Sequence, residues 1–201
     1  MSNPARIFLA AATLLVSAPA LSASFEEGTH YTVVAEEPSA EPQVMEFFSY
    51  GCGGCFMFDS WFQRMKAAVG ENVDIQYIPA DFGGGFWTPA QELFLVMDAL
   101  GLREQLHDEA FEFIHGERNP ITAASARRFM AQHGVSEEEY DKVRNSFAVH
   151  VKEQRYDQLT KRYRIRHTPT VIVNEKYEID HTKLAGPEEF VELVQYLLKN
   201  P

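Results

Sequence analysis

The chain has 201 residues, of which 45% are hydrophobic and 23% charged, and this composition excludes a disordered or collagen-like protein. Its length is that of one domain, or of one domain that carries a large insertion. The formal net charge of −11 repels phosphate backbones and argues against nucleic acid as a partner, and a total of two cysteines excludes a scaffold held by several disulfides.

The N-terminus has the pattern of an export signal. Arg6 is the first charged residue, an apolar run follows from Ile7 to Val16, and Ala20-Leu21-Ser22 fits the small-x-small rule for cleavage. We therefore predict a cleavable signal peptide over residues 1–22. The alternative is an uncleaved membrane anchor, for which this apolar stretch is slightly short. Export places the folded part of the chain in an oxidising compartment.

The next part of the chain predicts three strands and a helix. A β-prone segment at 31–34 is followed by a nearly continuous apolar strand at 44–48, interrupted only by Glu46. A helix then starts at the cysteines and runs to about Val69, where Gly70 ends it. The apolar residues alternate at 73–78, which indicates a further strand.

The segment 86–164 predicts helices only, and strands return after it. Capping boxes at Thr88 and Ser136 open the first and the last of these helices, and the last is expected to run unbroken to about Tyr163. Strands are expected at 170–173 and 176–179, joined by a tight turn, and a final helix begins at Gly186-Pro187. This order predicts an α/β fold from residues 23–85 and 165–201, with residues 86–164 as an all-helical insertion domain.

The chemistry is expected at Cys52 and Cys55, a C-x-x-C motif at a strand-to-helix junction. Free N–H groups and the dipole of the first helical turn lower the pKa of a thiol placed there. Cys52 is therefore the predicted nucleophile, and Cys55, one turn further, is the predicted resolving thiol of a Cys52–Cys55 redox disulfide. A disulfide across two residues closes almost no loop, so it is a poor staple. A zinc site is the alternative, but it needs two more ligands that the cysteine count and histidine spacing do not supply, and no metal is predicted.

The segment PQVMEFFSYGCGGC, from Pro42 to Cys55, resembles the active-site segment of the bacterial periplasmic DsbA family. The similarity continues in the same order over the mature chain, through ASFEEG from Ala23, EEYD from Glu138, NSF from Asn145 and TPTVIVNEKY from Thr168. This resemblance implies a thioredoxin fold with an inserted helical domain.

The resemblance also implies roles for residues outside the C-x-x-C motif. Thr168-Pro169 matches the family's cis-proline, which lies against the disulfide while the backbone of the preceding residue pairs with the substrate chain. Glu46 matches the family's buried acid, and we expect it to manage the proton of Cys55 as a general base. The alternative for Glu46 is a solvated position at a strand edge.

Two departures from the family pattern bear on the chemistry. The best-known family motif is C-P-H-C, whose histidine stabilises the thiolate, and here Gly53-Gly54 occupies the two middle positions. This protein is therefore expected to be a weaker oxidant, unless His167, with Arg166, supplies part of the missing positive charge. Tyr77 stands near the position where the family often has a lysine beside the buried acid, which argues against a glutamate–lysine pair.

The predicted function is that of a periplasmic thiol–disulfide oxidoreductase that donates its disulfide to newly exported, unfolded cysteine-containing proteins. The resemblance implies re-oxidation by a DsbB-like membrane quinone reductase, and we expect a monomer without metal or organic cofactor. The expected apolar surface for these substrates consists of Phe56, Phe82, Phe86 and Trp87, near the element ends around the motif. Two alternatives stay open, namely the same fold acting as a disulfide reductase or isomerase, and a non-catalytic, chaperone-like binder in which the pair is only structural.

Overall fold

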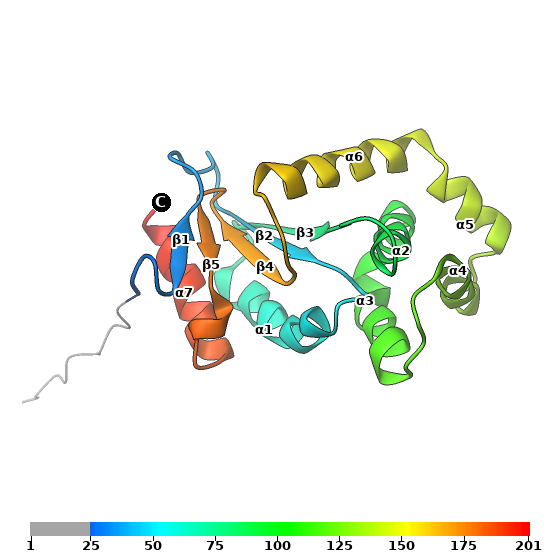
Figure 1. The fold of residues 1–201 in the computed structure, drawn as a ribbon, viewed down its shortest axis with the longest axis horizontal. Coiled ribbons are helices and arrows are strands. Elements are labelled where there is room, and N and C mark those ends of the chain that lie inside the picture. Colours follow the sequence, from blue (N-terminus) through cyan, green and yellow to red (C-terminus); the bar gives the residue numbers. More distant parts are fainter. Residues whose placement is uncertain (1–24) are drawn as a thin grey trace, which may run out of the picture.

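The computed structural model describes residues 25–201, so the predicted signal peptide lies outside the described residues. Its centre is a five-stranded mixed sheet with the strand order β1-β5-β4-β2-β3 (Figure 1). Strands β2 and β3 are parallel, and the other neighbouring pairs are antiparallel. The strands are β1 (Tyr31–Val33), β2 (Gln43–Phe48), β3 (Asp74–Pro79), β4 (Thr170–Val173) and β5 (Tyr177–Ile179).

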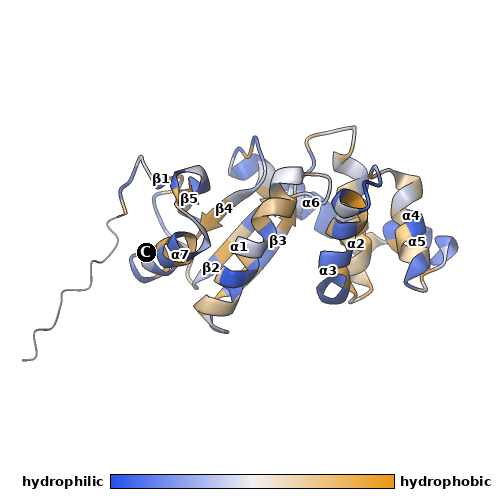
Figure 2. Cartoon of the chain, turned by 90° about the horizontal axis from the view of Figure 1, so that it is seen from below, coloured by the Kyte–Doolittle hydropathy of each residue, from blue (hydrophilic) through white to orange (hydrophobic). Residues whose placement is uncertain are grey.

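Two helices cover one face of the sheet, and five more lie between β3 and β4 in the chain. Figures 1 and 2 show α1 and α7 side by side on that face, whereas α6 returns along the opposite side. The helices are α1 (Gly53–Val69), α2 (Trp87–Ala99), α3 (Arg103–Phe111), α4 (Ala123–Gln132), α5 (Glu137–Arg144), α6 (Phe147–Arg162) and α7 (Pro187–Lys199). Helix α3 continues into a π-helical turn at Glu112–Gly116, and a short 3-10 turn occupies His181–Lys183.

Strand β2 is buried on both of its faces. Val44 and Phe48 belong to the large core that includes α1, α7 and the inserted helices, whereas Met45 and Phe47 pack on the opposite face with Ile172. Burial of each such side chain stabilises the fold by about 1.5–3 kcal/mol. Because side chains alternate along a strand, this pattern turns the intervening Glu46 toward α1.

The sequence placed several element ends correctly. Gly70 follows α1 with a φ of 83°, the left-handed conformation that glycine adopts without strain. Asn174 and Glu175 both have positive φ between β4 and β5, as a tight hairpin turn requires. Pro187 is the first residue of α7.

Two expectations in the helical segment were wrong. The predicted capping box at Thr88 is absent, because α2 already begins at Trp87 and the Thr88 hydroxyl instead donates to Asp81 at 2.7 Å. The single long helix expected from Ser136 is two helices, α5 and α6. Ser146 separates them, since its hydroxyl accepts the N–H of Val149 and so caps a new helix rather than continuing the old one. Among residues 25–201, no helix combines the length and the apolar character that a membrane crossing needs.

Candidate redox site

The turn between β2 and α1 delivers both cysteines to the start of α1. The N–H of Cys52 donates to the carbonyl of Ser49 at 3.0 Å, which closes the turn. Cys52 is the N-cap of the helix, and its Sγ accepts the backbone N–H of Cys55 at 3.3 Å. Both thiols are free, so the structure shows the dithiol form of the pair. A sulfur in the N-cap position receives the hydrogen bonds that an oxygen receives in an ordinary cap.

The environment makes the two thiols chemically unequal. Hydrogen bonding from the Cys55 thiol is the largest influence on Cys52 and, together with Thr168 and the first N–H groups of the helix, outweighs burial and lowers the pKa of Cys52 to about 5. Burial is the largest influence on Cys55 and raises its pKa strongly, helped by the negative charges of Cys52 and Glu46. Cys52 is half-buried and Cys55 is 1% exposed. Cys52 is therefore the thiol that ionises more easily and that another molecule can reach.

The loop before β4 lies against the pair. The Thr168–Pro169 peptide bond is cis, and the Thr168 carbonyl oxygen lies 3.4 Å from the Sγ of Cys52. A Cβ placed on Gly54 would lie 3.5 Å from the Cδ of Pro169, so the loop and the first turn of α1 are in direct contact. The Thr168 hydroxyl is buried and makes no hydrogen bond in the described part of the chain, so it is free to donate to a thiolate, and this influence lowers the pKa of both thiols.

Replacing Thr168 by valine is expected to raise the pKa of Cys52 by about one unit, because it removes a donor to the thiolate and keeps the shape of the side chain. Titration of the thiolate absorbance near 240 nm in the dithiol form measures this pKa. The Thr182→Val variant is the control, since Thr182 lies on the rim of the same groove but its hydroxyl donates to Asp180. Equal pKa values in wild type and Thr168→Val would contradict this role.

Glu46 lies beneath the pair and is 2% exposed. Burial raises its pKa well above the usual range, and the nearby charges of Asp59 and Cys52 raise it further. A carboxyl group of this kind holds its proton to a higher pH than an exposed glutamate does. In the sheet Glu46 stands opposite Tyr77 of β3, the residue found where the family often has a lysine.

A buried polar cluster beside Glu46 was not expected from the sequence. The Nε2 of His107 lies 3.0 Å from the Oδ1 of Asp59, and its Nδ1 lies 2.9 Å from the Tyr50 hydroxyl. Gln63 donates to the hydroxyl of Tyr77 at 3.0 Å. Asp59, His107 and Asp108 bring potential metal-ligand atoms within 4.8 Å of one another. Both ring nitrogens of His107 are already engaged in hydrogen bonds, so neither is free to bind a metal in this arrangement.

Apolar side chains and a groove surround Cys52. Phe56 and Met57 on α1 are 37% and 73% exposed, and Phe82 and Phe86 from the β3–α2 loop are each 36% exposed. Trp87, which was expected to join this surface, is half-buried and packs on the rings of Phe82 and Phe86.

A groove of about 620 Å³ runs beside the cis-proline, between the loop that precedes β4 and the 3-10 turn at His181–Lys183. His167 is exposed on its wall, and the Nδ1 of His167 lies 3.1 Å from the hydroxyl of Thr170. Gly54, Thr168 and Pro169 line the end of the groove that lies next to the redox pair.

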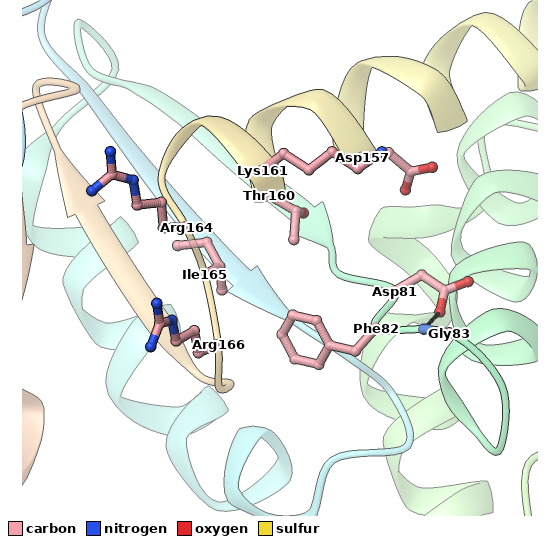
Figure 3. Close-up of a pocket in the computed structure, with 9 residues that line it drawn as sticks. All are labelled: Asp81, Phe82, Gly83, Asp157, Thr160, Lys161, Arg164, Ile165 and Arg166. Carbon is pink, nitrogen blue, oxygen red and sulfur yellow. Dashed lines mark hydrogen bonds between the residues drawn. The ribbon is translucent and has the colours of Figure 1, made fainter.

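A second pocket, of about 460 Å³, lies where the end of α6 meets the β3–α2 loop (Figure 3). The side chains of Arg164 and Arg166 point away from the carboxylates of Asp81 and Asp157, which lie on the other side of the pocket (Figure 3). Neither cysteine lines this pocket, so we assign it no part in the redox chemistry.

Comparison with known proteins gives one consistent result. The family model described as DSBA-like thioredoxin domain matches residues 43–197. The thiol:disulfide interchange protein DsbA of Pseudomonas syringae pv. tomato is 31% identical over 195 residues, which is 94% of this chain and 91% of the relative. DsbA of Escherichia coli K12 is 28% identical over 87% of this chain and 86% of the relative.

Solved structures agree with the sequence comparison. The crystal structure of Pseudomonas aeruginosa DsbA superposes with a TM-score of 0.77 at 29% identity, covering 88% of this chain and 94% of that one. A variant of Proteus mirabilis DsbA with the non-covalently bound peptide PWATCDS has a TM-score of 0.77 at 25% identity, covering 88% of this chain and all of that one.

Proposed function

This chain belongs to the family of DSBA-like thioredoxin domains and is a disulfide oxidoreductase with a thioredoxin fold and a helical insertion, and from this premise we propose that it donates a Cys52–Cys55 disulfide to newly exported proteins. The observation that carries the proposal is the inequality of the two thiols. A half-buried thiol with a pKa of about 5 lies beside a fully buried thiol whose pKa is raised. Such a pair favours its reduced form and therefore oxidises its partners.

The exchange runs in two balanced steps. A substrate thiolate attacks the Sγ of Cys52, the Cys52–Cys55 bond breaks, and Cys55 leaves with the electron pair and takes a proton from Glu46. A second substrate thiolate then attacks the substrate sulfur of the mixed disulfide, and Cys52 leaves as a stabilised thiolate. The substrate loses two electrons and gains a disulfide, and the pair gains both electrons. If the second attack is slow, Cys55 resolves the mixed disulfide in reverse and releases the substrate.

We propose that an extended substrate segment lies in the groove beside the cis-proline and pairs with the backbone of Thr168. The Proteus mirabilis DsbA structure with the bound peptide PWATCDS supports the binding of a cysteine-containing peptide by a protein of this fold. The exposed aromatic rings near Cys52 would hold apolar parts of an unfolded chain. His167, on the wall of the groove, adds a smaller stabilisation of the thiolate when it is protonated. The His167→Ala variant should then raise the pKa of Cys52 by less than Thr168→Val does, and an unchanged value would reject this part of the proposal.

The remaining parts of the proposal concern location and partners. We propose that residues 1–22 direct export to the periplasm and are removed there. The mature protein is then a monomer with a thioredoxin-like domain, residues 23–85 and 165–201, and a helical insertion domain, residues 86–164. A DsbB-like membrane quinone reductase re-oxidises the pair. The pattern of the first 22 residues and membership of the family support these points.

The redox equilibrium with glutathione separates this function from that of a reductase. The pair is expected to have a potential well above the roughly −270 mV of thioredoxin. Reduction of the pair by two glutathione thiols gives one thiolate and one thiol, so it releases one proton between the low pKa of Cys52 and about pH 8. The equilibrium constant for oxidation of glutathione by the pair should therefore rise about tenfold for each pH unit in this range. A potential at or below that of thioredoxin would instead favour a reductase. Inability to oxidise a dithiol peptide at all would favour a non-catalytic binder.

A further inference from the structure

Asp59 and His107 form a hydrogen-bonded pair that can bind and release a proton. The His107 side chain is 5% exposed, and both of its ring nitrogens have partners, Asp59 on one side and the Tyr50 hydroxyl on the other. A hydroxyl can donate to a neutral imidazole nitrogen or accept from a protonated one. His107 can therefore gain or lose a proton without giving up either hydrogen bond.

Asp59 connects this histidine to the redox pair. It lies four residues after Cys55 on α1, so both side chains are on the same face of the helix. After burial, the charge of Asp59 is the largest cause of the raised pKa of Glu46. The Asp59 side chain is 16% exposed, whereas Glu46 is 2% exposed, so Asp59 is also the wetter end of the cluster.

The other ionisable groups around His107 are few. Tyr77 of β3 packs on its ring at 5.0 Å between centroids, and Arg103 of α3 lies 5.2 Å from the Tyr77 ring on the same side of the core. Asp108 follows His107 on α3 and belongs to the same group of close side chains. Burial raises the pKa of both Tyr50 and Tyr77, so these two phenols stay neutral. The imidazole of His107 and the carboxyl group of Glu46 are therefore the two groups of this cluster between which we consider proton exchange.

We propose that His107 is a positioning residue that acts through Asp59 to control when Glu46 gives its proton to Cys55, an inference that rests on the proton role of Glu46 proposed above. With His107 neutral, the charge of Asp59 opposes a second carboxylate and Glu46 keeps its proton. When the disulfide opens and Glu46 protonates Cys55, a carboxylate forms beside Asp59. His107 then takes a proton from solvent, the Asp59–His107 pair becomes neutral, and the new charge on Glu46 is tolerated. In the finished dithiol form Glu46 takes up a proton again and His107 releases one, so that the buried carboxyl group is once more neutral.

The test is the pH profile, from pH 5 to 8, of the rate at which a dithiol peptide reduces the disulfide form. The wild-type profile is expected to contain a break that depends on a protonatable side chain at position 107. The His107→Gln variant keeps a donor for Asp59 but cannot titrate, so it should lose the break and react about tenfold more slowly at pH 6. The Asp59→Asn variant is the second probe, and it should lose the same break. His133→Gln is the matched control, because His133 packs on Phe129 away from the redox pair.

The Glu46→Gln variant shows whether His107 acts through Glu46. If it does, the Glu46→Gln, His107→Gln double variant should react as Glu46→Gln alone does. The inference is overturned if His107→Gln keeps the wild-type profile, or if the two effects multiply in the double variant. In both of these cases Glu46→Gln still alters the profile and the proton role of Glu46 survives. If Glu46→Gln has no effect by itself, that proposed role fails and the inference falls with it.

Discussion

The Cys52→Ser variant is expected to form no mixed disulfide with glutathione at pH 7, whereas the Cys55→Ser variant is expected to form one and to keep it. Cys52 is accessible, and its pKa of about 5 leaves it as a thiolate at neutral pH. Cys55 is 1% exposed, and burial raises its pKa strongly. Because the thiolate is the attacking species, the rates of the two single-cysteine variants should differ by a factor on the order of 1,000 or more.

Mass spectrometry of each variant after mixing with oxidised glutathione measures this difference. The wild-type dithiol is the control, and it should pass through the mixed disulfide quickly, because Cys55 resolves it to the intramolecular disulfide. Guanidinium-unfolded samples of both variants provide a second control, since unfolding removes burial and should bring the two rates together. A glutathione adduct that forms equally fast on both folded variants would contradict the assignment of nucleophile and resolving thiol.

The Glu46→Gln variant of the reduced protein is expected to be more stable than wild type at neutral pH and about as stable at pH 4. Burial and nearby negative charge raise the pKa of Glu46 in the folded state, so above its ordinary pKa the unfolded chain releases a proton that the folded chain retains. The wild type therefore loses stability as the pH rises through this window. The loss is about 1.4 kcal/mol for each pH unit above about 4.3 over which folded Glu46 stays protonated. Glutamine is neutral in both states and escapes this loss.

Urea unfolding of both proteins at several pH values, with a reductant present, gives this difference in free energy of unfolding. The charges of Cys52, Cys55 and Glu46 influence one another, so the same pair of proteins is also compared on a Cys52→Ser, Cys55→Ser background, in which the stability difference should still grow with pH. Glu41→Gln is the matched control, because Glu41 is exposed just before β2 and its replacement should change the stability by less than about 0.5 kcal/mol at any pH. A stability difference for Glu46→Gln that does not grow with pH would show that Glu46 is ionised in the folded protein.

Local sequence is enough to predict the parts of the site that depend on neighbours in the chain. Cys52 and Cys55 lie three residues apart behind an apolar strand, so the start of α1 and its free N–H groups follow from local geometry. Glu46 stood out because it is the one ionisable residue in that strand, and Thr168-Pro169 because a resemblance located it. The same local reasoning went wrong at Thr88 and at Ser146. The hydroxyl of Thr88 bonds to Asp81 instead of capping a helix, and the hydroxyl of Ser146 caps a new helix instead of leaving the old one to continue. The pattern of one segment does not show which of these hydrogen bonds forms.

Tertiary packing alone brings together the distant polar groups beside Glu46. His107 is 57 residues from Tyr50 and 48 from Asp59, and nothing in the local pattern of any of the three predicts that they meet. They meet because the inserted helices pack α3 against the large core on the α1 face of the sheet, and this burial gives the charge of Asp59 its effect on Glu46. The strength of an electrostatic interaction depends on distance and on exclusion of water, and both are properties of packing rather than of order along the chain.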